Sequence, residues 1–186
     1  MRTRLALLGA VVLLAAAGCQ NGGDTTVVTA SAPAEEIVEE PAAAAGGACI
    51  LWDYELIEQT TGVRFAVAAS DQVQDTSSCV VQTLEAAWPD LTLSVVETTK
   101  ANADIFLSER MPAKATKLSG LGRAGYRLTM KATAAHGPAV EIGWLSEAKQ
   151  LQTLRFTFAK DAPAAEVKDM NAKLLELAKA LSTTNG

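Results

Sequence analysis

The chain contains few of the residues from which metal and redox sites are built. Of its 186 residues, one is a histidine, His136, and three are cysteines. A single histidine excludes sites that need several imidazole ligands. Cys19, Cys49 and Cys79 lie far apart, so none belongs to the CxxC motif of zinc sites and thiol oxidoreductases. We therefore expect neither a metal ion nor another cofactor.

The chain also lacks an excess of positive charge. It has 16 Lys and Arg residues against 21 Asp and Glu residues, which gives a formal net charge of −5. Because binding to a phosphate backbone needs a basic surface, we do not expect nucleic acid as a partner.

No apolar run is long enough to cross a membrane. The uncharged run at residues 5–18, rich in Leu, Ala and Val, has only 14 residues, whereas a spanning helix needs about 20. Arg2 and Arg4 precede it, an arrangement typical of an export signal. We expect residues 1–18 to be a signal peptide.

The signal ends in Ala16-Ala17-Gly18-Cys19, which resembles a bacterial lipobox. In a lipobox, small residues precede a cysteine whose thiol carries diacylglycerol, and leucine is commoner at the position of Ala16. We expect Cys19 to be lipidated and to anchor the chain on the outer face of the cell membrane, because each buried methylene contributes about 0.8 kcal/mol. The alternative is an ordinary secretory signal in which Cys19 has no role.

The segment after Cys19 has the composition of a linker. Residues 20–47 lack aromatic residues, Lys and Arg, and include five acidic residues together with Gly, Pro, Thr and Ala. Such a segment buries too little apolar surface to offset the entropy of ordering it. We expect residues 19–47 to be a lipidated, disordered tether and residues 48–186 to be a single domain, which by itself carries a charge of about −2.

Cys49 and Cys79 are the two cysteines of this domain. Two cysteines in one small exported domain usually pair, so we expect a disulfide between them.

Hydrophobic periodicity predicts an α+β domain with a largely antiparallel sheet of about six strands packed against helices. The predicted helices cover residues 51–61, 101–110 and 163–181. The predicted strands cover residues 63–69, 79–84, 91–98, 126–133, 139–144 and 151–159, with loops at 70–78 and 114–125. The predicted order is α-β-β-β-α-β-β-β-α.

One motif matches a cofactor fingerprint in its letters. Gly120, Gly122 and Gly125 fit the GxGxxG pattern of dinucleotide-binding folds. That pattern works between a strand and a helix, whereas here an irregular segment precedes it and a predicted strand follows. We interpret it as a glycine turn in which the chain comes close to a neighbouring segment.

Two further residues are candidates for function. His136 lies beside Gly137-Pro138 in a predicted turn, and no partner for a catalytic histidine is evident, so we expect an exposed structural residue. Trp88 precedes Pro89 at another predicted turn, and an aromatic side chain there indicates a contact surface. The sixteen carboxylates of the domain leave a glycosidase-type pair open, because such a pair is defined by distance in space.

Taken together, these features resemble the small lipoproteins and secreted proteins of actinobacterial cell envelopes that are known only as domains of unknown function. The resemblance rests on the lipobox at Cys19, the low-complexity tether, Ala48-Cys49 before a helix, Cys79 at the start of a strand, and the closing amphipathic helix. Members commonly have proline where this chain has Ile50. The resemblance implies a Cys49–Cys79 bridge and an α+β fold, and it implies no catalytic residue.

The sequence thus predicts a lipid-anchored, extracytoplasmic envelope protein that acts as a non-enzymatic binding or accessory module. Its expected partners are the membrane, through the anchor, and an envelope protein or small ligand of unknown identity. Two alternatives remain open. The first is a hydrolase acting on the cell wall with unidentified carboxylates, and the second is a carrier of an apolar ligand in a cavity of several hundred Å³.

Overall fold

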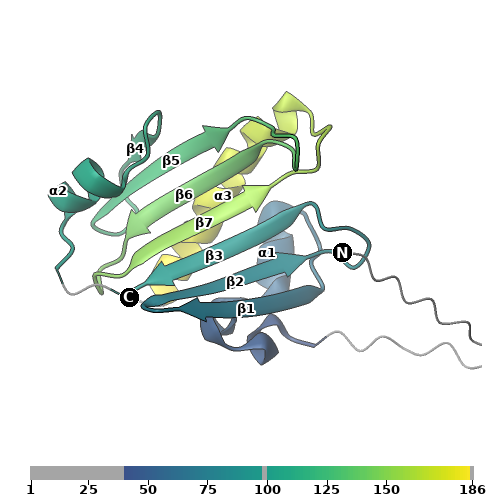
Figure 1. The fold of residues 1–186 in the computed structure, drawn as a ribbon, viewed down its shortest axis with the longest axis horizontal. Helices are drawn as coiled ribbons and strands as arrows, with labels where there is room; N and C mark the ends of the chain where they lie inside the picture. The colour runs from purple at the N-terminus through teal and green to yellow at the C-terminus, as the bar shows by residue number, and fades with distance from the viewer. Residues whose placement is uncertain (1–39, 98–99, 185–186) are drawn as a thin grey trace, which may run out of the picture. The chain divides into compact units, whose positions relative to one another are not determined.

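The computed structural model describes residues 40–97 and 100–184, with side chains as far as residue 181. It shows one antiparallel sheet in the order β1-β2-β3-β7-β6-β5-β4 (Figure 1). The strands are β1 (Val67–Val73), β2 (Thr76–Gln82), β3 (Asp90–Val96), β4 (Thr116–Leu118), β5 (Ala124–Met130), β6 (Ala139–Leu145) and β7 (Leu151–Thr157). The predicted α+β class is confirmed.

Three α-helices and three short turns of other helix types complete the fold of the described residues. The α-helices are α1 (Tyr54–Thr61), α2 (Ala103–Ile105) and α3 (Ala164–Thr184); the 3-10 turns are η1 (Ala42–Ala45) and η2 (Gly47–Leu51), and a π-helical turn, η3 (Phe106–Arg110), continues α2. Within the described residues, no helix combines the length and the apolar character that a membrane span requires.

Local chemistry explains the bounds of α1. The Asp53 carboxylate accepts a hydrogen bond from the Glu55 amide at 2.8 Å, which caps the first turn. At the other end Gly62 has a positive φ of 78° and donates its amide to the Glu58 carbonyl, a common helix stop.

Helices α1 and α3 cover one face of the sheet, where the hydrophobic core lies (Figure 1). Alternate strand residues point to this face, as expected from the two-residue period of a strand. Leu93, Leu154 and Ile142 are cross-strand neighbours there and are fully buried. Leu174 and Leu177 of α3 belong to the same buried cluster. We call the opposite face of the sheet the open face.

The pairing of β3 with β7 joins the two halves of the chain. Strands β1 to β3 form one meander and β4 to β7 form another, and the register of Leu93 against Leu154 connects them. The core therefore contains side chains from both halves.

Two predictions about the sheet are wrong. Residues 70–78, expected to be a loop, form the end of β1, a tight turn and the start of β2; residues 116–118, expected to be irregular, form β4, so the sheet has seven strands. The strand expected at residues 63–69 lies four residues later, as β1, and β4 was not expected at all; both lie at the edges of the sheet, and six of the seven residues of β1 are exposed. Such strands carry no apolar alternation for a sequence pattern to detect.

The predicted disulfide is confirmed, and it ties the start of the domain to the sheet. Cys49 in η2 is bonded to Cys79 in β2, and both residues are fully buried. The Ala48 amide also donates to the Ser77 hydroxyl at 2.8 Å.

The folded domain begins earlier than residue 48. Ala42 in η1 is only 1% exposed and belongs to the core cluster, and the Ser70 hydroxyl donates to the Ala45 carbonyl. Residues 42–47 are therefore part of the domain and not of the tether. Cys19 and the rest of the predicted tether, up to residue 39, lie outside the described residues.

Candidate functional site

Trp88 lies at one end of the sheet and packs against His136. The Trp88 ring is half-buried, and its centroid is 5.4 Å from the centroid of the His136 ring. His136 is also half-buried and donates from Nδ1 to the Gly137 carbonyl at 2.7 Å. The structure thus brings together the two residues that the sequence singled out separately.

A buried carboxyl group, Asp90, starts β3 two residues after Trp88. Asp90 is 8% exposed and pairs across the strands with Thr157. Burial raises the pKa of Asp90 above its ordinary value of 3.8, although the Thr157 hydrogen bond and the charges of Arg155 and His136 act in the opposite direction. Among the described residues, Asp90 Oδ1 has no hydrogen-bond partner.

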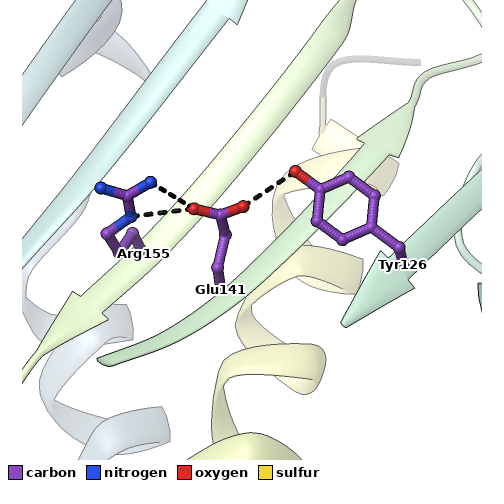
Figure 2. Close-up of polar contacts among 3 residues, drawn as sticks. All are labelled: Tyr126, Glu141 and Arg155. Atoms are coloured by element: carbon purple, nitrogen blue, oxygen red, sulfur yellow. Dashed lines mark hydrogen bonds and ion pairs between the residues drawn. The ribbon is translucent and has the colours of Figure 1, made fainter. Parts of the chain in front are cut away.

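A second buried carboxylate lies on the open face, where Glu141 of β6 contacts two side chains from neighbouring strands (Figure 2). The Tyr126 hydroxyl donates to Glu141 Oε1 at 2.9 Å, and Arg155 Nε donates to Oε2 at 2.8 Å, with Nη2 donating to the same oxygen. Glu141 is 3% exposed, whereas about half of the Arg155 side chain is accessible. We call these three residues the Glu141 network.

The surroundings of Tyr126 hold this network in place. The Tyr126 ring lies over Gly143, where an added Cβ would come within 2.3 Å of a ring atom. On η3, the Phe106 ring stacks on the Tyr126 ring, with 5.8 Å between the two ring centroids. Burial raises the pKa of Tyr126 well above its usual value, and the neighbouring Glu141 carboxylate raises it further. The phenol therefore keeps its proton and remains a hydrogen-bond donor.

The sequence pattern did not reveal the Glu141 network, although the sequence contains one signal of it. Glu141 is the only charged residue of an otherwise apolar strand, Ala139–Leu145, every residue of which is buried. A lone carboxylate in such a strand needs a cationic or donor partner, because an unpaired buried charge is costly. The identity of that partner depends on strand register, which the sequence pattern did not give.

Two surface grooves lie along the first half of α3, one on each flank. The first has a volume of about 460 Å³ and lies between α3, the end of β7 and the end of α1. Its lining includes three carboxylates, Asp161, Glu166 and Asp169, and one lysine, Lys173, which forms an ion pair with Asp169 at 3.0 Å.

The second groove is larger, about 680 Å³, and lies between α3 and the end of β5. Its apolar lining includes Met130, Pro138 and Val167. Three lysines also line it, Lys131, Lys160 and Lys168, and all three are exposed. We call it the lysine groove.

The GxGxxG motif forms the connection between β4 and β5, and a strand follows it where a dinucleotide-binding fold has a helix. A Cβ on Gly122 would lie 2.2 Å from the Leu145 carbonyl oxygen, and Arg123 donates its amide to that oxygen. The interpretation of a glycine turn in close contact with a neighbouring segment is confirmed.

No group of three or more His, Cys, Asp or Glu residues in the described part of the chain is placed to hold a metal ion. The Glu141 network likewise engages both oxygens of its carboxylate with neighbouring side chains. The two grooves along α3, by contrast, leave space for another molecule.

No protein-family model, curated protein or solved structure matches this chain.

Proposed function

We propose that this chain is a lipid-anchored envelope protein whose domain is a non-enzymatic binding module, acting outside the cytoplasmic membrane. The observation that carries the binding role is the lysine groove. Its volume lies in the range of small-molecule sites, about 300–1,000 Å³, and its apolar lining carries a few polar groups that give a ligand its orientation.

The contacts of Glu141 support a binding role over a catalytic one. A catalytic carboxylate must be able to reach a substrate, whereas Glu141 is buried and bonded on both oxygens. The network is well suited to hold strands β5, β6 and β7 in register on the open face of the sheet.

The anchor is tested by mass spectrometry of the mature N-terminus. We expect acyl chains on Cys19, and we expect the Cys19→Ser variant to lose stable acylation. An unmodified thiol at residue 19, or protein located inside the cell, would contradict the proposed location.

The binding role is tested by crosslinking in intact cells followed by purification. We expect a specific ligand or partner to be recovered with the wild-type chain. Turnover of an envelope substrate without any recovered partner would contradict the role.

The first groove favours a second candidate function, a hydrolase acting on wall polymer. It brings Asp161, Glu166 and Asp169 to one depression, and paired carboxylates are the usual machinery of glycoside hydrolysis. If this candidate is correct, Asp161→Asn and Glu166→Gln should each reduce wall-polymer cleavage by at least about 100-fold. If it is wrong, wild-type protein should show no cleavage to lose.

A further inference from the structure

We propose that the lysine groove binds an amphiphile with a single acyl chain and an anionic head group, a carboxylate or a phosphate. This inference rests on the proposed binding function and names its ligand class. The groove is formed by the end of β5, the residues before β6 and the first two turns of α3.

The floor of the groove provides a place for an acyl chain. The lining contains Met130, Pro138, Val167 and three alanines, Ala132, Ala162 and Ala164. Burying apolar ligand surface against such side chains is favourable by about 25 cal/mol per Å². A purely ionic ligand such as inorganic phosphate would leave this surface uncovered.

The charges of the groove provide a place for an anionic head group. Lys131, Lys160 and Lys168 line it, and among the described residues no carboxylate does so and none forms an ion pair with these lysines. Lysine stems can lie along apolar surface while their ammonium groups remain in water, and all three of these lysines are exposed, so the cations are accessible to a head group. A neutral lipid would make no use of them.

The first groove is an internal comparison for this assignment. It flanks the same helix and also has an apolar part, including Phe156, Phe158 and Met170, but its charged lining is mainly acidic. Helix α3 thus separates two grooves of opposite charge. An anionic amphiphile is expected to select the lysine groove and to avoid the first groove.

The test uses the full-length, acylated chain in phosphatidylcholine vesicles and photoreactive 12-carbon probes. The probes carry a carboxylate, a phosphate monoester or an alcohol at one end. Mass spectrometry then locates and quantifies the labelled peptides. We expect one or both anionic probes to label residues 129–138 and 160–171. The amount of labelling should be about fivefold higher than with the alcohol probe, which is the ratio that two weak surface ion pairs would give.

Labelling by the carboxylate would identify a fatty acid type of ligand, and labelling by the phosphate would identify a phospholipid type; either supports the proposal. Equal labelling by the alcohol would overturn it, because the lysines would then have no role. Loss of anionic labelling on adding the same concentration of inorganic phosphate would also overturn it, because the acyl chain would then have no role.

Two variants locate the site. Lys160→Ser combined with Lys168→Ser should reduce anionic labelling about fivefold, whereas the matched control, Lys117→Ser with Lys149→Ser, removes two exposed lysines outside the groove and should change nothing. Ala164→Trp should reduce labelling by filling the groove while keeping every lysine. If the control lowers labelling as much as the groove pair, the proposal is wrong.

Failure of this inference is distinct from failure of the proposed function. Specific crosslinking of a partner without groove labelling would leave a binding module with another ligand. Cleavage of an envelope substrate with no partner would overturn the binding function itself.

Discussion

At the scale of single residues, the two buried acid groups of the sheet, Glu141 and Asp90, differ in their hydrogen-bond partners. Glu141 lies among buried neighbours but has Arg155 and Tyr126 as partners. Asp90 has only part of its bonding capacity used, and its Oδ1 has no partner among the described residues. Glu141 should therefore stabilise the native state, whereas Asp90 should destabilise it by an amount that depends on pH.

For the Glu141 network, we expect Tyr126→Phe to lower the free energy of unfolding by about 1.5–3 kcal/mol, the usual range for a hydrogen bond to a charged group. Urea unfolding measures this. In a Glu141→Gln background the same substitution should cost about half as much, because the acceptor is then neutral. A cost below about 0.5 kcal/mol in the wild-type background would show that the bond contributes little.

For Asp90, the raised pKa fixes the direction of the pH effect. The folded state takes up the proton more readily than the unfolded chain, so the contribution of Asp90 to stability is full below pH 3.8 and is lost as the pH rises through the folded-state pKa. Asp90→Asn should remove this loss and should be more stable than wild type at neutral pH.

The measurement is the free energy of unfolding between about pH 3 and about pH 8. The control, Asp75→Asn, changes an exposed residue in the turn between β1 and β2. If Asp90→Asn has the same pH profile as wild type, Asp90 does not behave as a buried acid.

At the scale of elements, the loop between β4 and β5 needs glycine for two different reasons, a positive φ and the absence of space for a Cβ. Gly120 has a positive φ of 76°, and a Cβ added there would have no atom within 4 Å. Gly122 has a positive φ of 53°, and its Cβ would meet the Leu145 carbonyl oxygen at 2.2 Å. The first therefore needs only the conformation, and the second needs both the conformation and the space.

We expect Gly120→Ala to lower the free energy of unfolding by about 1–2 kcal/mol, the cost of a left-handed backbone with a side chain. Gly122→Ala should cost roughly 2–5 kcal/mol, because a steric clash adds to that strain. Thermal and urea unfolding of the two variants measure the difference. Equal costs would show that Leu145 moves aside without penalty.

The sequence predicted elements well where one face of a strand or helix is buried. The long helix was expected at residues 163–181 and forms Ala164–Thr184, and strands β5 to β7 lie within a few residues of their expected positions. It placed the edge strand β1 four residues too early and missed the edge strand β4. It also did not anticipate that the helix at residues 101–110 changes to a π-helical turn at Phe106, where the Met111 amide bonds to the Phe106 carbonyl.

At the scale of the whole molecule, the disulfide could be predicted from the sequence, whereas the grooves could not. Cys49 and Cys79 could be paired because the domain offers no other cysteine. The lysine groove joins residues near 130 to residues near 165 across the flank of a helix. Its existence depends on how α3 crosses the sheet, and no local pattern specifies that.

We expect replacement of both cysteines, Cys49→Ala with Cys79→Ala, to lower the free energy of unfolding by about 3–4 kcal/mol. This is the chain-entropy value for a closed loop of 30 residues. Urea unfolding of the variant measures the loss, and wild-type protein treated with reductant should show a similar one. A loss below about 1 kcal/mol would mean that the unfolded chain is compact without the bridge.

The pairing of β3 with β7 has a consequence for how the protein is made. Leu91, Leu93 and Val95 of β3 are made midway through synthesis, yet the strand that pairs with them, Leu151–Thr157, and helix α3, which shares their core cluster, are made last. While the roughly 60 residues from the end of β3 to the end of β7 are made, about a third of the chain, the nascent chain therefore presents a bare apolar strand edge, the kind that joins readily to another copy. A product that stops before residue 151 should aggregate, and the complete chain should need protection until its last third has appeared.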